Sequence, residues 1–276
     1  MELQLYHTVL LLAGSINILI AFVLLHNNYW YHDYGVYHRS RRLVALTYVI
    51  FGIGFLLHEH FEWRTSWPAA ATALSLTYFH CAGVFFGWSH TSLLNPLYLN
   101  KMVVRRDLTI LFVSIIAYWI APLTAPEGAS IDLSLNSKAI EAPLGAVWGA
   151  FFLHAAFIAF TFYRTYYQVR RNILHMPADA EAPQWWTPEL KRTVLSSHHS
   201  FIIGAHLIIL FGIGGIVITA LLPTAVWPFT LLLVAGICVF IYIFYSLTEY
   251  GNVIESGACA TEDAATGNKS KRIINK

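Results

Sequence analysis

Apolar residues fall into seven long stretches that are separated by polar connections. The stretches cover residues 5–26, 43–61, 69–94, 108–125, 143–163, 197–222 and 226–247. Each is close to the ~20 apolar residues that a helix rising ~1.5 Å per residue needs to cross ~30 Å of hydrocarbon. None of them contains Lys or Arg. The pattern predicts an all-α membrane protein, a seven-transmembrane helix bundle.

Basic residues lie almost entirely on one side of these predicted spans. Fifteen of the seventeen Lys and Arg residues fall in alternate connections or in the carboxyl-terminal segment, and only Arg64 and Lys138 fall on the other side. Cytoplasmic connections of membrane proteins carry the excess of Lys and Arg. We therefore expect the amino terminus outside the cell and the carboxyl terminus in the cytoplasm.

Composition agrees with a membrane protein. Hydrophobic residues make up 57% of the chain and charged residues 12%, whereas about a quarter of the residues in a soluble protein are charged. We expect residues 1–256 to form the transmembrane domain. Residues 257–276 are polar without apolar periodicity and are expected to form a disordered cytoplasmic tail. The basic residues are spread among the connections and do not indicate direct nucleic-acid binding.

Three histidines near the middle of predicted spans are the leading candidates for function. His80, His154 and His206 belong to three different spans and lie at about the same depth. Ionisable groups inside a bilayer are costly and mark functional sites by default. An imidazole can hydrogen-bond, bind a metal or haem iron, and change charge near neutral pH. Three interpretations stay open: neutral interhelical hydrogen bonds, a ligand-binding or proton-sensing pocket, and a metal or haem site.

A second set of histidines lies at the cytoplasmic ends of two spans. His90 ends one span, and His198 and His199 begin another. They are candidates for a polar track from the interior to the inner surface. The alternative is that they only anchor the helices at the headgroups.

The outer end of the second span contains a candidate metal site. His58 and Glu62 are four residues apart on one helical face, and His7 stands at the outer start of the first span. Two histidines and a carboxylate are a ligand set that zinc accepts. The sequence His58-Glu59-His60 lacks the HExxH spacing of a zinc protease.

The longest inner connection, 164–196, is the candidate surface for a cytoplasmic partner. It carries Arg170 and Arg171 near its start and Trp185 and Trp186 in its middle. Basic and aromatic residues of this kind also suit a segment that lies on the anionic inner leaflet.

The sequence also lacks several catalytic signatures. It has no GxSxG motif, P-loop or Gly-rich dinucleotide loop. The last span contains no lysine, so it offers no attachment point for a retinal Schiff base. The sequence therefore points away from an enzyme and identifies no cofactor, with haem or a metal left open.

Several short stretches resemble a known family: Arg39-Ser-Arg-Arg-Leu, Ala73-Leu-Ser-Leu-Thr77, Trp88-Ser-His-Thr-Ser-Leu-Leu-Asn-Pro96, Arg105-Arg-Asp107 and Phe162-Tyr-Arg-Thr-Tyr166. They are similar to the amino-terminal seven-transmembrane sensor region of Bacteroides-type membrane-bound transcriptional regulators and histidine kinases. In that family a DNA-binding or kinase domain normally follows the last helix. Here about two dozen polar residues follow it.

The resemblance implies a membrane-embedded signal-sensing or accessory module in the bacterial inner (cytoplasmic) membrane. We expect such a module to relay a signal to a cytoplasmic signalling protein, and a homodimer is compatible with this role. Two alternatives stay open. One is an intramembrane redox enzyme with a histidine-ligated metal or haem, and the other is a small-solute carrier.

Overall fold

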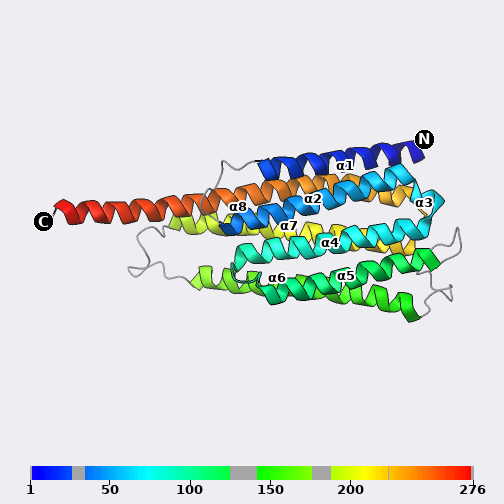
Figure 1. Cartoon of the computed structure of the whole chain (residues 1–276). Coiled ribbons are helices and arrows are strands. Elements are labelled where there is room, and N and C mark those ends of the chain that lie inside the picture. Colours follow the sequence, from blue (N-terminus) through cyan, green and yellow to red (C-terminus); the bar gives the residue numbers. More distant parts are fainter. Residues whose placement is uncertain (1, 27–34, 125–141, 176–187, 223, 275–276) are drawn as a thin grey trace.

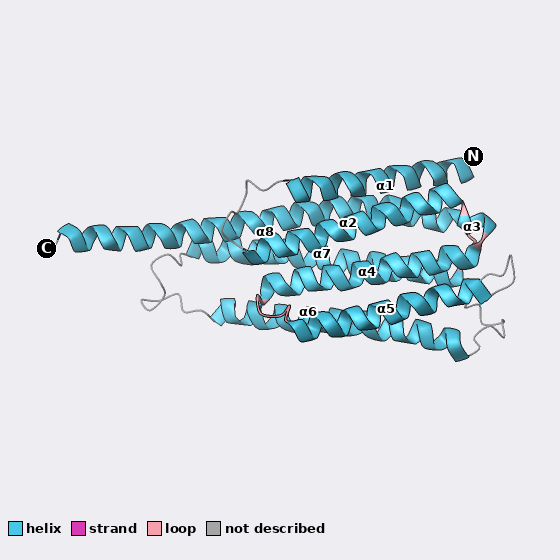
Figure 2. Cartoon of the chain, viewed as in Figure 1, coloured by secondary structure: helices cyan, strands magenta, loops and turns pink. Residues whose placement is uncertain are grey.

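The computed structural model describes residues 2–26, 35–124, 142–175, 188–222 and 224–274, and all regular elements within these ranges are helices (Figures 1 and 2). Seven of the helices are long: α1 (Glu2–His26), α2 (Gly35–Phe61), α4 (Pro68–Leu94), α5 (Lys101–Thr124), α6 (Ala142–His175), α7 (Pro188–Leu221) and α8 (Val226–Ile274). The short α3 (Trp63–Ser66) joins α2 to α4.

Each predicted span corresponds to one long helix, and the prediction of an all-helical fold is confirmed among the described residues. Among the described residues, five helical segments are long and apolar enough to cross a membrane, in α1, α2, α4, α7 and α8. This indicates a multi-pass membrane protein. The long helices lie side by side in Figure 1, with the amino terminus and α3 at one end of the bundle and the end of α8 at the other.

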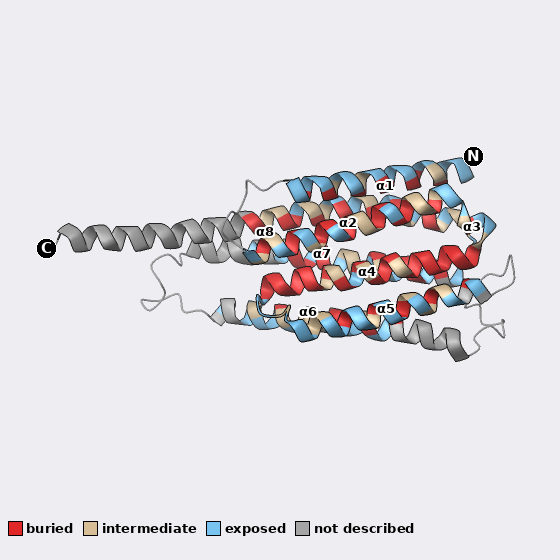
Figure 3. Ribbon diagram, in the orientation of Figure 1, coloured by how far each residue is buried: buried red, intermediate tan, exposed pale blue. Residues whose placement is uncertain are grey.

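α4 is the central helix of the bundle. It packs against α2, α5, α6 and α7, and 78% of its apolar window is buried, compared with 33–56% in the other four candidate spans. Figure 3 shows burial along almost its whole length. Its first turns are rich in alanine, from Ala69 to Ala73, and small side chains let neighbouring helices approach closely. Pro68 occupies the first helical position, where no backbone donor is needed.

Large apolar side chains cover the outer surface of the bundle. On α1, Leu12, Leu19 and Phe22 are 51–63% exposed. A soluble protein would rarely leave such a continuous apolar surface open. The exposed face therefore fits contact with lipid.

α8 is longer than the predicted last span. The sequence predicts a disordered tail from residue 257, whereas α8 is one continuous helix to Ile274 and extends beyond the bundle (Figure 1). No proline follows Pro228, so the chain has no residue that sterically ends the helix.

Candidate functional site

A line of four polar side chains runs through the interior of the α4–α5–α6 group. Tyr118 Oη lies 2.8 Å from His80 Nδ1, and His80 Nε2 lies 2.8 Å from His154 Nδ1. His154 Nε2 lies 3.5 Å from Asp107 Oδ1, a close electrostatic contact that is longer than an ordinary hydrogen bond. All four residues are buried, with at most 5% of their surface exposed. We call these four residues the polar chain.

Helix periodicity places the members of the polar chain on matching faces. On α5, Asp107, Ser114 and Tyr118 are spaced by seven and four residues, so they share one face, and all three are buried. On α4, His80 and Trp88 are eight residues apart, which is about two turns. Because α4 and α5 pack against each other after a short turn, Tyr118 meets His80 while Asp107 meets Trp88.

Asp107 is held by donors from three helices. Trp88 Nε1 from α4 and Arg106 Nε from α5 each donate a hydrogen bond of 2.7 Å to its carboxylate, and His154 approaches from α6. Arg106 is partly exposed, and its guanidinium lies 4.7 Å from the centre of the Phe157 ring. Asp107 precedes the predicted span 108–125. Burial raises the pKa of its carboxyl group, but hydrogen bonds from His154, Arg106 and Trp88 and the charge of Arg106 outweigh burial and lower the pKa to about 2.

The ionised carboxylate gives the polar chain a direction. The negative charge of Asp107, 3.5 Å from His154 Nε2, favours the His154 tautomer with its hydrogen on Nε2, so Nδ1 accepts. His80 Nε2 then donates to His154, and Tyr118 donates to His80 Nδ1. Every hydrogen points toward Asp107. From Asp107 to Tyr118 the polar chain extends ~16 Å along α5, which is about half the thickness of the hydrocarbon.

His206 does not join the other two mid-span histidines. Its Nδ1 donates to the carbonyl of Ile202 on its own helix at 2.7 Å, and its ring lies beside Tyr163. The residue is exposed, whereas its neighbour Ala205 is buried. The position of His206 near the middle of its predicted span therefore did not determine the face of α7 on which it lies.

The predicted inner track is not continuous in the part of the chain that the structure describes. His90 is buried, stacks on Phe201 with ring centres 4.6 Å apart, and donates from Nδ1 to the carbonyl of Phe86. His199 is exposed, and the side chain of His198 lies outside the described residues. His90 belongs instead to the wall of the cavity described below.

The structure brings together two of the three residues of the predicted outer metal site. His7 Nε2 lies 3.9 Å from Glu62 Oε1. His58 is fully buried, and its Nε2 is hydrogen-bonded to Ser75 Oγ inside the bundle. Among the described residues, no three His, Cys, Asp or Glu side chains are grouped closely enough to hold a metal ion.

The predicted partner surface is described only in part. Arg170 and Arg171 are exposed near the carboxyl end of α6, where a partner could reach them. Trp185 and Trp186 lie outside the described residues.

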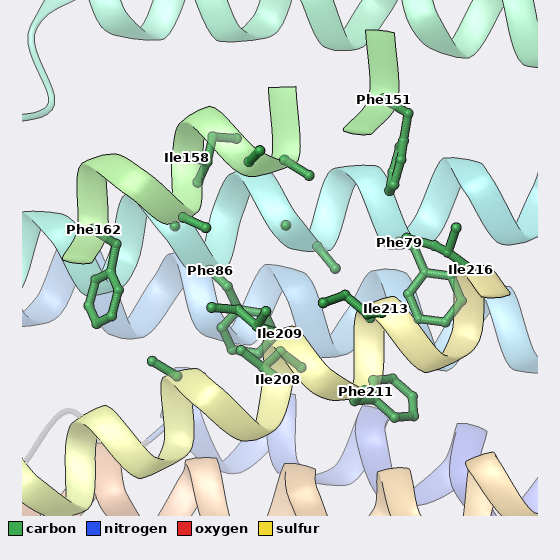
Figure 4. A pocket seen from close by; sticks show the side chains of 18 of the residues that line it. Phe79, Phe86, Phe151, Ile158, Phe162, Ile208, Ile209, Phe211, Ile213 and Ile216 are labelled. Carbon is green, nitrogen blue, oxygen red and sulfur yellow. The ribbon is translucent and has the colours of Figure 1, made fainter. Parts of the chain in front are cut away.

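A cavity of about 280 Å³ lies next to the polar chain, between α4, α6 and α7 (Figure 4). Figure 4 shows Phe79 of α4, Phe151 of α6 and Ile213 of α7 around it. The Phe151 ring also packs against His80, with ring centres 5.0 Å apart. One side chain is thus part of the cavity wall and touches the polar chain.

Sequence reasoning missed Tyr118, Asp107, Trp88 and Arg106. Asp107, Ser114 and Tyr118 did carry a signal, because they are polar residues at helical spacing in or beside an otherwise apolar span. An acidic residue at the end of a span that contains no other acid was a second signal.

Comparison with known protein families, with curated proteins and with solved structures gives no match for this chain. The fold and the polar chain define a helical, multi-pass membrane protein with a buried hydrogen-bonded network, and its function has to be argued from that geometry.

Proposed function

We propose that this chain is a signal-sensing or accessory module of a bacterial cytoplasmic membrane that relays a signal to a cytoplasmic partner. It spans the membrane seven times, with the amino terminus outside and the carboxyl terminus inside. The polar chain is the observation that carries this proposal. The resemblance to sensor regions is consistent with it.

The arrangement of the helices supports the seven spans and their orientation. α5 and α6, the two long helices besides the five apolar ones, both pack along the central α4. The basic residues Lys101 and Arg105 begin α5, and Arg171 lies near the end of α6. The turn before α5 is at the opposite end of the bundle from α3 (Figure 2). An excess of cations at one end is the usual mark of the cytoplasmic side.

The polar chain provides an element with two states. In the described state every hydrogen points toward Asp107. A proton added to His154 makes both of its ring nitrogens donors. His80 must then accept on Nε2 and donate from Nδ1 to Tyr118. A change beside Asp107 therefore reverses the hydrogen bond at Tyr118, ~16 Å away along α5.

A reversal of this kind is a suitable basis for a sensor. A signal acts by favouring one helix arrangement over another, and the polar chain links α4, α5 and α6 through bonds that depend on protonation. α4 packs on α7, and α7 packs on α8. Because α8 continues to Ile274, a shift inside the bundle can reach a partner beyond the membrane.

The same distances support a sensor better than a histidine-ligated metal or haem enzyme. Nitrogens that share a metal direct their lone pairs at the ion from ~2.0–2.1 Å. His80 Nε2 and His154 Nδ1 face each other at 2.8 Å, which is hydrogen-bond geometry. His206, the third ligand in that alternative, lies apart from them.

The proposal is tested by photo-crosslinking in cells, with a photo-reactive amino acid introduced at Arg171. We expect a specific cytoplasmic protein to be captured, with a yield that changes several-fold in His154→Gln. His206→Gln is the matched control, because it makes the same chemical change outside the polar chain, and its yield should equal that of the wild type. Capture of no specific protein, or equal yields in wild type and His154→Gln, would contradict the proposal.

A further inference from the structure

The cavity between α4, α6 and α7 has an almost wholly apolar wall. Phenylalanine, isoleucine, alanine and glycine side chains make up nearly all of it. Figure 4 shows Phe86, Phe162 and Ile209 among the residues around the space. Small-molecule sites commonly have such a wall with a few placed polar groups. His90 is the one residue among the described lining residues with a polar side chain.

His90 offers a hydrogen-bond acceptor to this cavity. Its Nδ1 lies 3.0 Å from the carbonyl oxygen of Phe86, and a carbonyl oxygen only accepts, so Nδ1 carries the hydrogen. In the neutral ring, Nε2 is then an acceptor. Among the described residues, none donates a hydrogen bond to that atom. The residue is only 4% exposed, and stacking on Phe201 fixes the ring.

The cavity is accessible from the outer surface of the bundle. Phe152 of α6 and Ile213 of α7 line it and are 46% and 50% exposed. α6 and α7 make little contact with each other, since each packs mainly on α4 or α8. The opening between them faces the side of the bundle that lies in lipid if the helices cross a membrane.

We propose that this cavity binds an uncharged, mostly apolar molecule from the bilayer that carries a hydroxyl group, which donates a hydrogen bond to His90 Nε2. The described wall offers no charged group to pair with an ionic ligand, and an ion would be costly in this setting. A plain hydrocarbon would leave the acceptor of His90 buried without a partner.

The inference names the ligand class of the sensor proposed above and rests on that function only for the consequence of binding. Phe151 connects the two, because it lines the cavity and packs on His80. A bound molecule that displaces this ring would act directly on the polar chain.

Two glycines make the cavity easy to fill. A Cβ added to Gly83 of α4 or to Gly212 of α7 would meet nothing within 4 Å, and both residues line the cavity. Leucine at either position should therefore occupy the space without a clash. Gly35 at the start of α2 also has open space and lies outside the cavity, so Gly35→Leu is the matched control.

The test is photo-labelling of the purified full-length protein in lipid nanodiscs with a long-chain alkanol that bears a diazirine. Its methyl ether serves as the probe without a donor. We expect the alkanol to label the cavity residues of α4, α6 and α7 above the other lipid-facing helices. The ether should label them about 3- to 10-fold less, the range for one hydrogen bond.

The variants separate the parts of this proposal. His90→Phe keeps an aromatic ring and should reduce labelling by the alkanol to the level of the ether. Gly83→Leu and Gly212→Leu should abolish labelling of the cavity, while Gly35→Leu should leave it intact. Equal labelling by the two probes, or cavity labelling that persists in both leucine variants, would overturn the proposal.

These outcomes are independent of the crosslinking experiment at Arg171. Loss of cavity binding with crosslinking intact would remove the ligand class and leave the sensor. Cavity labelling without any captured partner would keep the ligand class and remove the sensor function.

Discussion

Glycines have opposite effects on the two sides of this bundle. Between α1 and α2, a Cβ on Gly14 would lie 3.2 Å from the backbone oxygen of Gly52, and a Cβ on Gly52 would lie 3.1 Å from that of Gly14. The two helices are in close backbone contact there. Around α4 and α7, Gly83 and Gly212 face open space. The same residue type thus closes one helix pair and leaves a ligand-sized space beside another.

The hydrogen-bond partners of buried polar groups also differ between the two sides of the bundle. In the α1–α2–α8 side, Tyr37 and Tyr48 of α2 donate to backbone carbonyls of α8. Such bonds do not change with the protonation of a side-chain partner. In the α4–α5–α6 side, the polar groups bond to one another and include two imidazoles. We infer that the linked imidazoles let the second side change state in a way that the tyrosine–carbonyl bonds of the first side do not.

Removal of the Asp107 carboxylate should produce the largest loss of stability on the changeable side. In Asp107→Leu, the buried Trp88 Nε1 loses its acceptor, and one unsatisfied buried donor costs about 1–3 kcal/mol. We expect the free energy of unfolding, measured by reversible denaturation in detergent, to fall by about that amount. Asp107→Asn keeps one acceptor oxygen and should lose less. An Asp107→Leu variant as stable as the wild type would contradict the claim that the Asp107 carboxylate stabilises the fold.

A comparison of two glycine substitutions tests the contrast between the sides directly. Gly52→Leu forces a side chain into the α1–α2 contact and should cost about 1–3 kcal/mol, the usual range for overpacking. Gly83→Leu enters open space and should change stability by less than about 0.5 kcal/mol. Thermal unfolding of both variants in one detergent measures the difference. Equal destabilisation would show that the two sides are packed alike.

The coupling between His80 and His154 should be smaller. Interhelical hydrogen bonds in membrane proteins contribute about 0.6 kcal/mol on average and up to about 1.7. A double-mutant cycle with His80→Gln and His154→Gln should give a coupling energy in that range. A cycle that pairs His80→Gln with His206→Gln should give none, because His206 bonds within its own helix. Coupling energies of equal size in the two cycles would show that His80 and His154 have no specific interaction, and would contradict the polar chain.

Acid should weaken the polar chain as the Asp107 carboxylate takes up a proton. The pKa of Asp107 is about 2 in the fold, below its ordinary value of 3.8. Its contribution to stability is therefore complete above about pH 4 and is lost as the pH falls toward 2. The difference in melting temperature between wild type and Asp107→Asn should stay constant down to about pH 4.5 and shrink below it. A difference that instead changes near neutral pH would assign the titration to another group.

The sequence was sufficient to place the helices but only partly sufficient to assemble the site. Apolar length and the absence of cations located the seven long helices, five of which contain a segment long and apolar enough to cross a bilayer. They did not show which helix faces meet. His80 and His154, which the sequence places near the middle of their spans, hydrogen-bond to each other, whereas His206 is exposed on α7. Asp107 was overlooked because it stands one residue before its span.

The glycines of α7 also show that sequence alone does not determine which helix faces meet. Gly212, Gly214 and Gly215 lie within one turn of α7, a spacing that favours close approach of a neighbouring helix. A Cβ on Gly215 would indeed strike the ring of Phe79, but Gly212 borders the cavity. One helical pattern supports both outcomes, and only the position of the neighbouring helix decides between them.

The most direct test of the polar chain is nitrogen NMR of the protein in lipid bilayers with ¹⁵N-labelled histidine. Our account predicts a coupling through the hydrogen bond between His80 Nε2 and His154 Nδ1, with the hydrogen on Nε2 of both rings, and its disappearance in His154→Gln. Two imidazoles without mutual coupling would contradict it.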